Sequence, residues 1–559
     1  MSQGAAEIQN PTDAPHARHA LARPRRVPGR WAGMLVALAV VAVAGVVHGV
    51  GMSTSPVRFD DEGTYVSQAW AVQSKGSLGH YTYWYDHPPL GWITIALWTW
   101  ATGAFERSAN AVAAGREFLL IAHLMSCASL YVLARRLSMG RAFAAVAVAL
   151  FSLSPLAVFF HRMVLLDNLA MTWAIAAFAL ALTPSRRLWA YAASGACLGA
   201  AALTKETALL LLPALALAVW QSSDRRTRSF CVAVFSSALF MVGSIYPLFA
   251  LLKGELLPGA GHVSLVDGVV FQLFSRESSG SVFDPTSLAR ANVDGWLAAD
   301  PWLLCVALAL STIALLVRRL RAITLAFVLQ AVMILRPGYL PFGHAIGMLP
   351  FAALIVAGVC DALWKWRLGQ GIGNPARGAL AGAVVRPWRF IGPVLTATAL
   401  ALAAGFVVPH WAAGDWRYMR DDQDVAYREA TQWISQHVDR EDRLLVDNSV
   451  WIDLVHGGFD SSAVEGGFYS DQVIWFWKLD RDPAVVRRFP GGWRDFDYVV
   501  SSEILRSSIH LTRQTPLALT NSRVVARFGA GPGRVEIRRV QPWKGARTPA
   551  PVRARGAIR

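Results

Sequence analysis

Long apolar segments recur along the first three quarters of the chain and are separated by short polar stretches. Most have about twenty residues, the length that a helix needs to cross a hydrocarbon core of about 30 Å. The pattern predicts spanning helices near residues 31–51, 113–134, 142–160, 164–183, 188–204, 206–220, 229–252, 301–317, 322–335, 344–364 and 390–410. The sequence therefore predicts a polytopic α-helical membrane protein with about eleven transmembrane helices in a domain of residues 31–410.

One further apolar segment, residues 88–104, is a poor candidate for a crossing. It is short and begins with Pro88 and Pro89, which disfavour a regular helix at that point. Its tryptophans are residues typical of the headgroup region. We expect an interfacial or shallow re-entrant segment, since a full crossing would move every later arginine cluster to the opposite side of the membrane.

The first apolar segment follows a basic leader that contains Arg18, Arg23, Arg25, Arg26 and Arg30. A cleaved signal peptide is one interpretation. The apolar segment is longer than a typical signal core and the basic leader is extended, so we favour an uncleaved first helix. Residues 1–30 are then a basic cytoplasmic N-terminus.

Basic residues outnumber acidic ones by 53 to 37, which gives a net charge of +16. They gather at every second boundary between apolar segments, the pattern of cytoplasmic loops and not of a nucleic-acid-binding surface. These clusters are Arg135/Arg136/Arg141, Arg186/Arg187, Arg225/Arg226/Arg228, Arg318/Arg319/Arg321 and the stretch from Lys365 to Arg389. The opposite, extracytoplasmic face then carries an outer loop, residues 52–112, and everything after residue 410.

Residues 411–540 mix charged and apolar residues as a soluble α/β domain does. A helix is predicted near residues 421–438, and strands at RLLVD, DYVVSS, SRVVARF and RVEIRRV. The aromatic run VIWFWK should leave one aromatic side chain exposed unless this domain packs on another part of the chain. Residues 541–559 are rich in Pro, Ala and Arg and are predicted to be a disordered basic tail.

All five cysteines fall inside apolar segments, so they predict neither a disulfide framework nor a CxxC metal site. We expect them to pack between helices as small apolar residues. They are Cys127, Cys197, Cys231, Cys305 and Cys360.

Candidate chemistry gathers on the predicted outer face. The outer loop contains Asp60, Asp61 and Glu62 in a row, and Asp86 and His87 follow. Further polar residues stand at outer helix ends: Arg162 and Asp167, Lys205 and Glu206, and Arg336, Tyr339 and His344. Taken singly, such acidic residues are usually solvated and such lysines usually extend to the interface.

Several ionisable clusters of opposite sign on one membrane face are harder to explain by solvation alone. Carboxylates beside cations suit a reaction with an anionic, membrane-held substrate. A carboxylate takes a proton from the nucleophile, and Arg or Lys holds a phosphate that leaves with negative charge.

At these residues the sequence resembles the C-type glycosyltransferases that use polyprenyl-phosphate-linked sugars, especially the branch of protein O-mannosyltransferases and lipid A aminoarabinose transferases. The resemblance rests on the pair Asp61-Glu62 and on residues 83–90, 162–168 and 199–205, in this order. It covers residues 31–410, most strongly 57–213, and does not include the C-terminal domain.

The resemblance implies an inverting transfer of a sugar from a polyprenyl phosphate to an acceptor on the extracytoplasmic side. It implies catalytic roles for Asp61, for Glu62 beside it and for Asp167, which lines the same cavity, and it implies that Lys205 contacts the carrier phosphate. His87 stands where relatives often have lysine, so its role is in doubt. Plausible phosphate or sugar contacts are Arg162, Arg336 and Tyr339.

No nucleotide sugar and no cofactor are expected. A divalent cation is possible but not required, because the fixed cations already supply the countercharge. The acceptor, whether lipid, glycan or protein, is left open.

Two other classes of protein fit parts of the pattern. A transporter or lipid flippase predicts charges or broken helices at mid-span and internal repeats, whereas the charges here lie at helix ends and no repeat is evident. A non-catalytic scaffold would leave the polar residues of the outer face unexplained.

Overall fold

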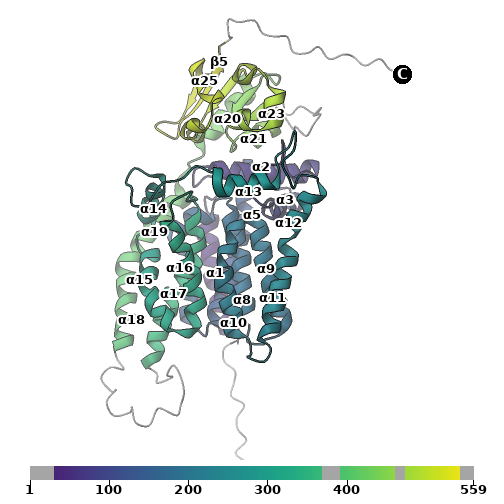
Figure 1. The fold of residues 1–559 in the computed structure, drawn as a ribbon. Helices are drawn as coiled ribbons and strands as arrows, with labels where there is room; N and C mark the ends of the chain where they lie inside the picture. Colours follow the sequence, from purple (N-terminus) through teal and green to yellow (C-terminus); the bar gives the residue numbers. More distant parts are fainter. Residues whose placement is uncertain (1–29, 368–390, 460–471, 542–559) are drawn as a thin grey trace, which may run out of the picture.

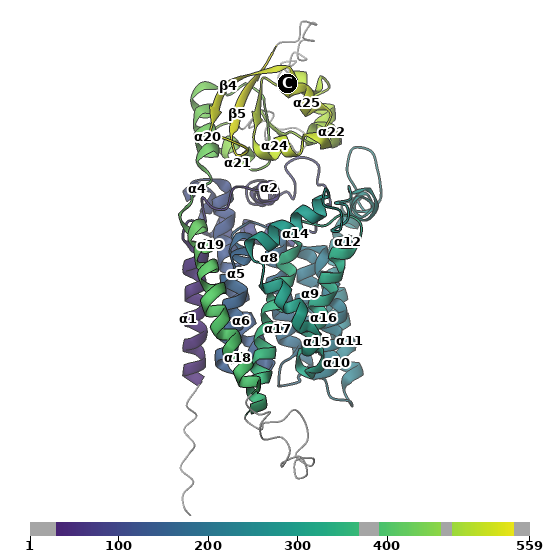
Figure 2. The same ribbon diagram turned by 90° about the vertical axis from the view of Figure 1, so that its left-hand side faces the viewer.

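A computed structural model describes residues 30–367, 391–459 and 472–541. These residues form a long helical bundle with a smaller unit on one end (Figures 1 and 2). The predicted basic N-terminus, most of the basic stretch 365–389 and the basic tail after residue 541 lie outside the described residues.

All eleven apolar segments predicted to span the membrane are helical. The helices of the bundle are α1 (Arg30–Gly49), α5 (Ala111–Arg136), α6 (Arg141–Leu153), α7 (Pro155–His161), α8 (Leu166–Ala181), α9 (Leu188–Thr204), η1 (Glu206–Leu211), α10 (Leu212–Ser222), α11 (Arg228–Gly243), α12 (Ile245–Leu252), α15 (Leu303–Leu316), η3 (Arg318–Leu320), α16 (Arg321–Leu335), α17 (His344–Arg367) and α18 (Ile391–Leu402). Among the described residues, five helices are long and apolar enough to cross a membrane, or seven if two bent pairs each count as one. The number of eleven crossings stays a prediction.

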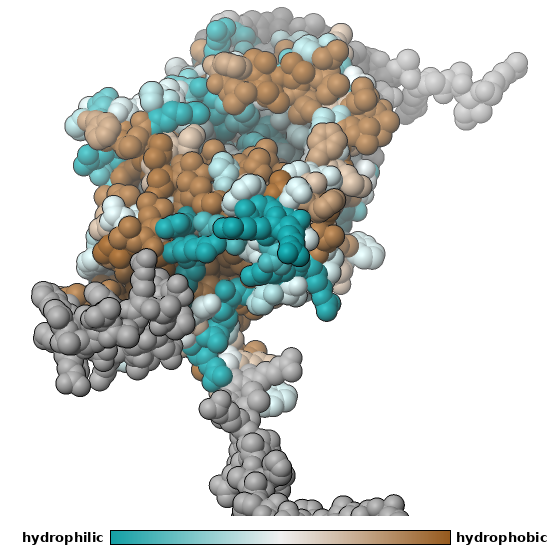
Figure 3. All heavy atoms as spheres, turned by 60° about the horizontal axis from the view of Figure 1, so that its bottom comes forward, coloured by the Kyte–Doolittle hydropathy of each residue, from teal (hydrophilic) through white to brown (hydrophobic). Residues whose placement is uncertain are grey.

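The flanks and the far end of the bundle differ in polarity. Large apolar side chains such as Leu38, Phe240 and Leu316 are exposed on the flanks. Figure 3 shows hydrophilic residues gathered at the end of the bundle that is remote from the smaller unit. A hydrocarbon layer suits the flanks, and a polar face suits the far end.

The single span predicted at residues 142–160 is wrong in one respect. The structure breaks it between α6 and α7, which meet at a bend of 63°. Pro155 has no N–H with which to continue the α6 helix and instead begins α7. The Ser154 hydroxyl at the break donates to Asp300 Oδ2 at 2.5 Å. Asp300 itself lies at a second break, of 94°, between α14 (Leu288–Ala299) and α15.

Short helices lie across the end of the bundle that faces the smaller unit (Figure 1). They are α2 (Asp60–Lys75), α3 (Leu90–Thr102), α4 (Ala104–Arg107), α13 (Leu265–Val270), η2 (Phe271–Ser275) and α14. The 13 residues of α3 span about 20 Å, less than a hydrocarbon core of about 30 Å, and the surface location of residues 88–104 stays a prediction.

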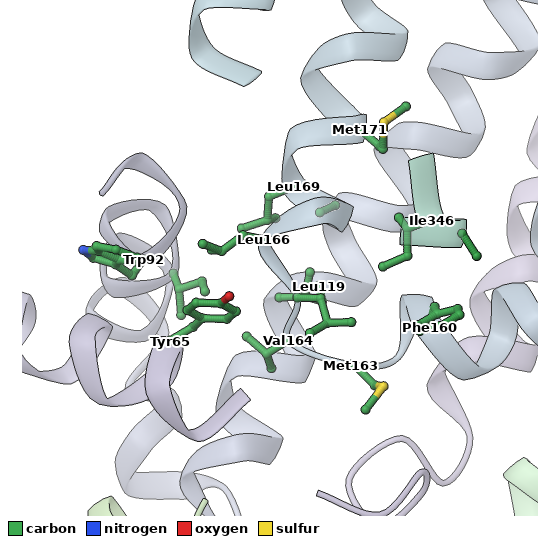
Figure 4. Close-up of a cluster of buried hydrophobic side chains, with 14 of the residues drawn as sticks. Tyr65, Trp92, Leu119, Phe160, Met163, Val164, Leu166, Leu169, Met171 and Ile346 are labelled. Atoms are coloured by element: carbon green, nitrogen blue, oxygen red, sulfur yellow. The ribbon is translucent and has the colours of Figure 1, made fainter. Parts of the chain in front are cut away.

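An apolar layer supports α2 and α3. Figure 4 shows Tyr65 of α2 and Trp92 of α3 beside Leu166 at the start of α8. A Cβ atom on Gly91 would lie 2.4 Å from Leu166 Cδ2, so glycine permits this close approach. The packing fixes the height of α2 above the bundle.

The smaller unit is an α/β fold with a five-stranded sheet in the order β2-β1-β3-β5-β4. Strands β1 and β2 pair in parallel, as do β1 and β3, whereas β5 is antiparallel to both β3 and β4. The strands are β1 (Leu444–Val446), β2 (Val473–Trp475), β3 (Tyr498–Ser501), β4 (Ser522–Phe528) and β5 (Val535–Val540). Strands therefore occur at all four predicted sites.

The remaining helices of this region are α20 (Val425–His437), α21 (Trp451–His456), α22 (Lys478–Arg481), α23 (Pro483–Arg488), η7 (Gly492–Asp495), α24 (Glu503–Ser507), η8 (Ile509–Leu511) and α25 (Gln514–Thr520). The predicted boundary at residue 411 is too early. The helix that begins with α18 continues through η6 (Ala403–Val407) and α19 (Val408–Arg420). Helix-forming residues follow Pro409 without a break as far as Arg420, and the chain becomes extended at Asp421.

The smaller unit is docked on the outer loop. Arg58 Nε lies 2.5 Å from Asp424 Oδ1, and Arg58 Nη1 lies 2.6 Å from Asp453 Oδ2. A Cβ atom on Gly63 would lie 2.2 Å from the Asn448 carbonyl carbon, so the backbones meet directly. This contact covers the first turn of α2.

Candidate active site

The first turn of α2 carries the acidic residues of the outer loop. Asp60, Asp61 and Glu62 follow the N-cap residue Phe59, where carboxylates are favoured by the unpaired N–H groups of the helix. Asp61 lies in the field of Lys205, Arg276 and His87. Burial raises the pKa of the Asp61 carboxyl above its usual value, and these three side chains only partly oppose the shift.

Lys205 stands between α9 and η1, where the chain is extended for one residue. Its side chain is only 7% exposed. The Nζ atom lies 2.9 Å from His87 Nε2 and 3.8 Å from Asp167 Oδ2. Burial lowers the pKa of Lys205, but the charges of Asp167, Glu206 and Asp61 outweigh that effect and leave the pKa raised, so the ammonium stays charged.

His87 joins Lys205 to a carboxylate. Its Nδ1 atom lies 3.0 Å from Glu206 Oε2, while its backbone carbonyl accepts hydrogen bonds from Tyr83 and Tyr246 at 3.0 and 3.2 Å. Hydrogen bonds to its ring and to its backbone carbonyl therefore hold His87 in place.

Arg276 brings a second cation to this cluster. Its guanidinium carbon lies 3.5 Å from the ring centroid of Tyr339, and its Nη1 atom donates to Gln272 Oε1 at 2.7 Å. Gln272 in turn donates to the Asp86 carbonyl at 2.9 Å. The stacked ring holds the planar guanidinium beside Asp61 and Lys205.

Eight residues were given a catalytic or binding role from the sequence, and five of them come together here: Asp61, Asp167, Lys205, His87 and Tyr339. Glu206, which was noted in the sequence without a role, and Arg276, which was not noted, complete the cluster. Arg276 lies between the predicted spans 229–252 and 301–317, in a stretch with no recognisable motif, so no local signal marked it.

Glu62 does not join the cluster. Its side chain is fully buried, and its two oxygens accept from Arg116 Nε and Nη2 at 2.8 and 2.7 Å. They also accept from the backbone N–H groups of Val164 and Phe59. These four hydrogen bonds occupy the carboxylate, so the catalytic role implied for Glu62 does not fit this geometry.

Arg162 and Arg336 also stand apart. The buried Arg162 guanidinium donates to the carbonyl groups of Val47, Val50 and Tyr418. This ties the end of α1 to α19 and leaves the guanidinium engaged with backbone. Arg336 is exposed, and no described contact connects it to the cluster.

The cluster combines one carboxylate with a raised pKa, two further carboxylates and two fixed cations. Such a site can accept a proton at Asp61 and stabilise an anionic group beside Lys205 and Arg276. Among the described residues, no three His, Cys, Asp or Glu side chains converge as metal ligands.

Residues 86–249 match the family described as dolichyl-phosphate-mannose-protein mannosyltransferase. This segment contains His87, Asp167, Lys205 and Glu206. A comparison with curated proteins finds no match.

Two crystal structures of ArnT from Cupriavidus metallidurans have a similar fold. One is the apo state and the other is bound to undecaprenyl phosphate. Each is 17% identical to this chain, covers 91% of it and 98% of ArnT, and matches with a TM-score of 0.52. The similarity extends over the bundle and the smaller unit together.

Proposed function

From the fold of the C-type glycosyltransferases, which this chain shares, we propose that it transfers a sugar from a polyprenyl-phosphate carrier to an acceptor at the membrane surface. The observation that carries the proposal is the convergence of Asp61 with Lys205 and Arg276. The base can take the proton from the acceptor, and the two cations can stabilise the phosphate that leaves the donor.

In the proposed reaction, Asp61 removes the proton from an acceptor hydroxyl or amine. The acceptor atom forms a bond to the anomeric carbon while the bond from that carbon to the phosphate oxygen breaks. The electron pair leaves with the phosphate, whose charge Lys205 and Arg276 stabilise. A single displacement of this kind inverts the anomeric centre.

The donor class follows from the site and the fold. A lysine and an arginine suit the phosphodiester of a lipid-linked sugar and the phosphate monoester that leaves, and a polyprenyl chain suits the apolar flanks of the bundle. The ArnT structure with undecaprenyl phosphate supports a carrier of this class. The kind of sugar and the acceptor stay open.

We place the site on the extracytoplasmic side. The turn between α10 and α11, which carries Arg225 and Arg226, lies at the end of the bundle opposite α2 (Figure 1), and the positive-inside rule assigns that end to the cytoplasm. Nucleotide sugars are made in the cytoplasm, which is a further reason to expect a lipid-linked donor.

We propose that transfer needs no divalent cation, because Lys205 and Arg276 supply the countercharge. A chelator should then leave the rate unchanged. A rate that falls with chelation and returns with a divalent cation would contradict this part of the proposal.

The experiment that tests the function is a transfer assay with purified protein and radiolabelled polyprenyl-phosphate sugars, with Asp61→Asn as the matched inactive control. The variant is nearly isosteric and removes the base. Labelled product that forms with the wild type and not with Asp61→Asn supports the proposal. Movement of the labelled lipid across a vesicle bilayer without product would instead favour a flippase.

A further inference from the structure

Residues 80–87, which we call the docking loop, link the smaller unit to the candidate site. The first part of the loop contacts the smaller unit. The Tyr81 hydroxyl donates to the Val473 carbonyl at 3.0 Å, and the Thr82 hydroxyl donates to Asp482 Oδ1 at 2.9 Å. The His80 ring lies 4.2 Å from the ring of Trp475. The aromatic run 473–477 therefore packs against the outer loop.

At the centre of this contact is a buried cation, Lys478. Its side chain is 3% exposed, and its Nζ atom lies 2.8 Å from the fully buried Asp482. The ammonium also lies 4.7 Å from the ring of Trp84 and 4.8 Å from that of Trp477. One ring belongs to the docking loop and the other to the smaller unit, so the cation joins the two.

The second part of the docking loop enters the site. Three residues after Trp84, the backbone carbonyl of His87 accepts from Tyr83 and Tyr246, and its ring contacts Lys205 at 2.9 Å. A chain of three residues can extend by only about 10 Å. A displacement of Trp84 is therefore transmitted to His87 and to the phosphate-facing side of the site.

We propose that Lys478 is a positioning residue for the donor site. By holding Trp84 and the docking loop, it holds His87 against Lys205 and so sets the place of the donor phosphate. The inference rests on the proposed function. It assigns the smaller unit an influence on donor binding.

The test uses the purified full-length protein and undecaprenyl phosphate as the probe, with affinity measured by direct binding. Lys478→Met should weaken binding at least about fivefold, the scale of a lost cation–π contact. Lys478→Arg, which keeps the charge, should recover much of the affinity.

The matched control is Lys365→Met. Lys365 also pairs with an aspartate four residues away, at 2.9 Å from Asp361 Oδ2, but at the other end of the bundle. It should leave the affinity unchanged. A wild-type affinity in well-folded Lys478→Met would overturn the inference.

A thermodynamic cycle tests the route of the effect. Trp84→Ala and Lys478→Met should be non-additive in donor affinity, because each removes the same contact. Additive losses would show that Lys478 acts by another route and would refute the inference. If Lys478→Met does not fold, Thr82→Val, which removes only the hydrogen bond to Asp482, takes its place.

A second readout needs no ligand. In a variant without the native cysteines, Asp86→Cys should react faster with a thiol reagent when it is combined with Lys478→Met than when it stands alone. An unchanged rate would refute the positioning role. If the rate rises but the wild type binds no undecaprenyl phosphate, the proposed function fails while the coupling of Lys478 to the loop stands.

Discussion

The Nζ atom of Lys205 and the Nε2 atom of His87 lie 2.9 Å apart. An ammonium group has only donors, so Nε2 must be the acceptor, and the His87 proton is on Nδ1, which donates to Glu206. The imidazole is then neutral and links a cation to a carboxylate. This relay fixes the direction of the Lys205 side chain, which still has donors free for a phosphate.

Lys205→Ala should weaken donor binding and slow transfer. The lysine is a buried, charged group whose partners are all within the candidate site, so its loss removes a charge-assisted contact to the phosphate. Donor affinity should fall about tenfold or more, measured by direct binding of undecaprenyl phosphate. The control is Lys75→Ala, at the exposed end of α2. Equal affinities for wild type and Lys205→Ala would favour a lysine that only extends to the interface.

Arg276→Ala should have a comparable effect on donor affinity, whereas Tyr339→Phe should have little. The ring of Tyr339 positions the guanidinium by stacking at 3.5 Å, and phenylalanine retains that face. Binding of undecaprenyl phosphate to the three proteins checks this. A large loss with Tyr339→Phe would show that the hydroxyl is needed as well, through its contact with Arg276 or with the donor.

The pH dependence of transfer should report Asp61. Burial raises the pKa of this carboxyl, and only the deprotonated form can accept the proton of the acceptor. The rate should therefore fall as pH decreases through the raised pKa, at a higher pH than for an ordinary aspartate. The profile of kcat/KM against pH measures it. An acidic limb near pH 4 would contradict a buried base.

The apolar pattern predicted the long helices of the bundle because a hydrocarbon layer requires long apolar segments, whatever residues pack beside them. It did not predict the bend at Ser154. That bend depends on Pro155 and on Asp300, which is nearly 150 residues away in the chain, and such a contact leaves no local signal. The α19 boundary was placed too early because the polar residues in the second half of α19 no longer follow the apolar pattern.

The site was predicted in part for a similar reason. Asp61 and Lys205 interrupt apolar sequence, and that is visible locally. Glu62 carries the same signal, but its role depends on Arg116, which pairs with it across 54 positions. Arg276 became meaningful only when the fold placed η2 beside Tyr339.

Glu62→Gln should lower stability instead of acting on the chemical step. The Glu62–Arg116 pair is buried, with exposures of 0% and 1%, and removing one charge of such a pair costs about 3–5 kcal/mol. The apparent melting temperature in detergent should fall, while that of Asp61→Asn should change little. If Glu62→Gln melts like the wild type yet transfers no sugar, the catalytic role implied by the sequence resemblance is restored.

The sidedness of the site can be tested at two exposed serines. Ser138 lies in the turn between α5 and α6 among the arginines of a predicted cytoplasmic cluster, and Ser278 lies two residues after Arg276. In a variant without the five native cysteines, Ser278→Cys should react with an impermeant thiol reagent in intact cells. Ser138→Cys should react only after the cells are made permeable.

Both expectations depend on α3 lying at the membrane surface. A crossing by residues 88–104 would place every later residue on the opposite side of the membrane. Labelling of position 138 together with protection of position 278 would place the site in the cytoplasm, where a nucleotide sugar would become the expected donor.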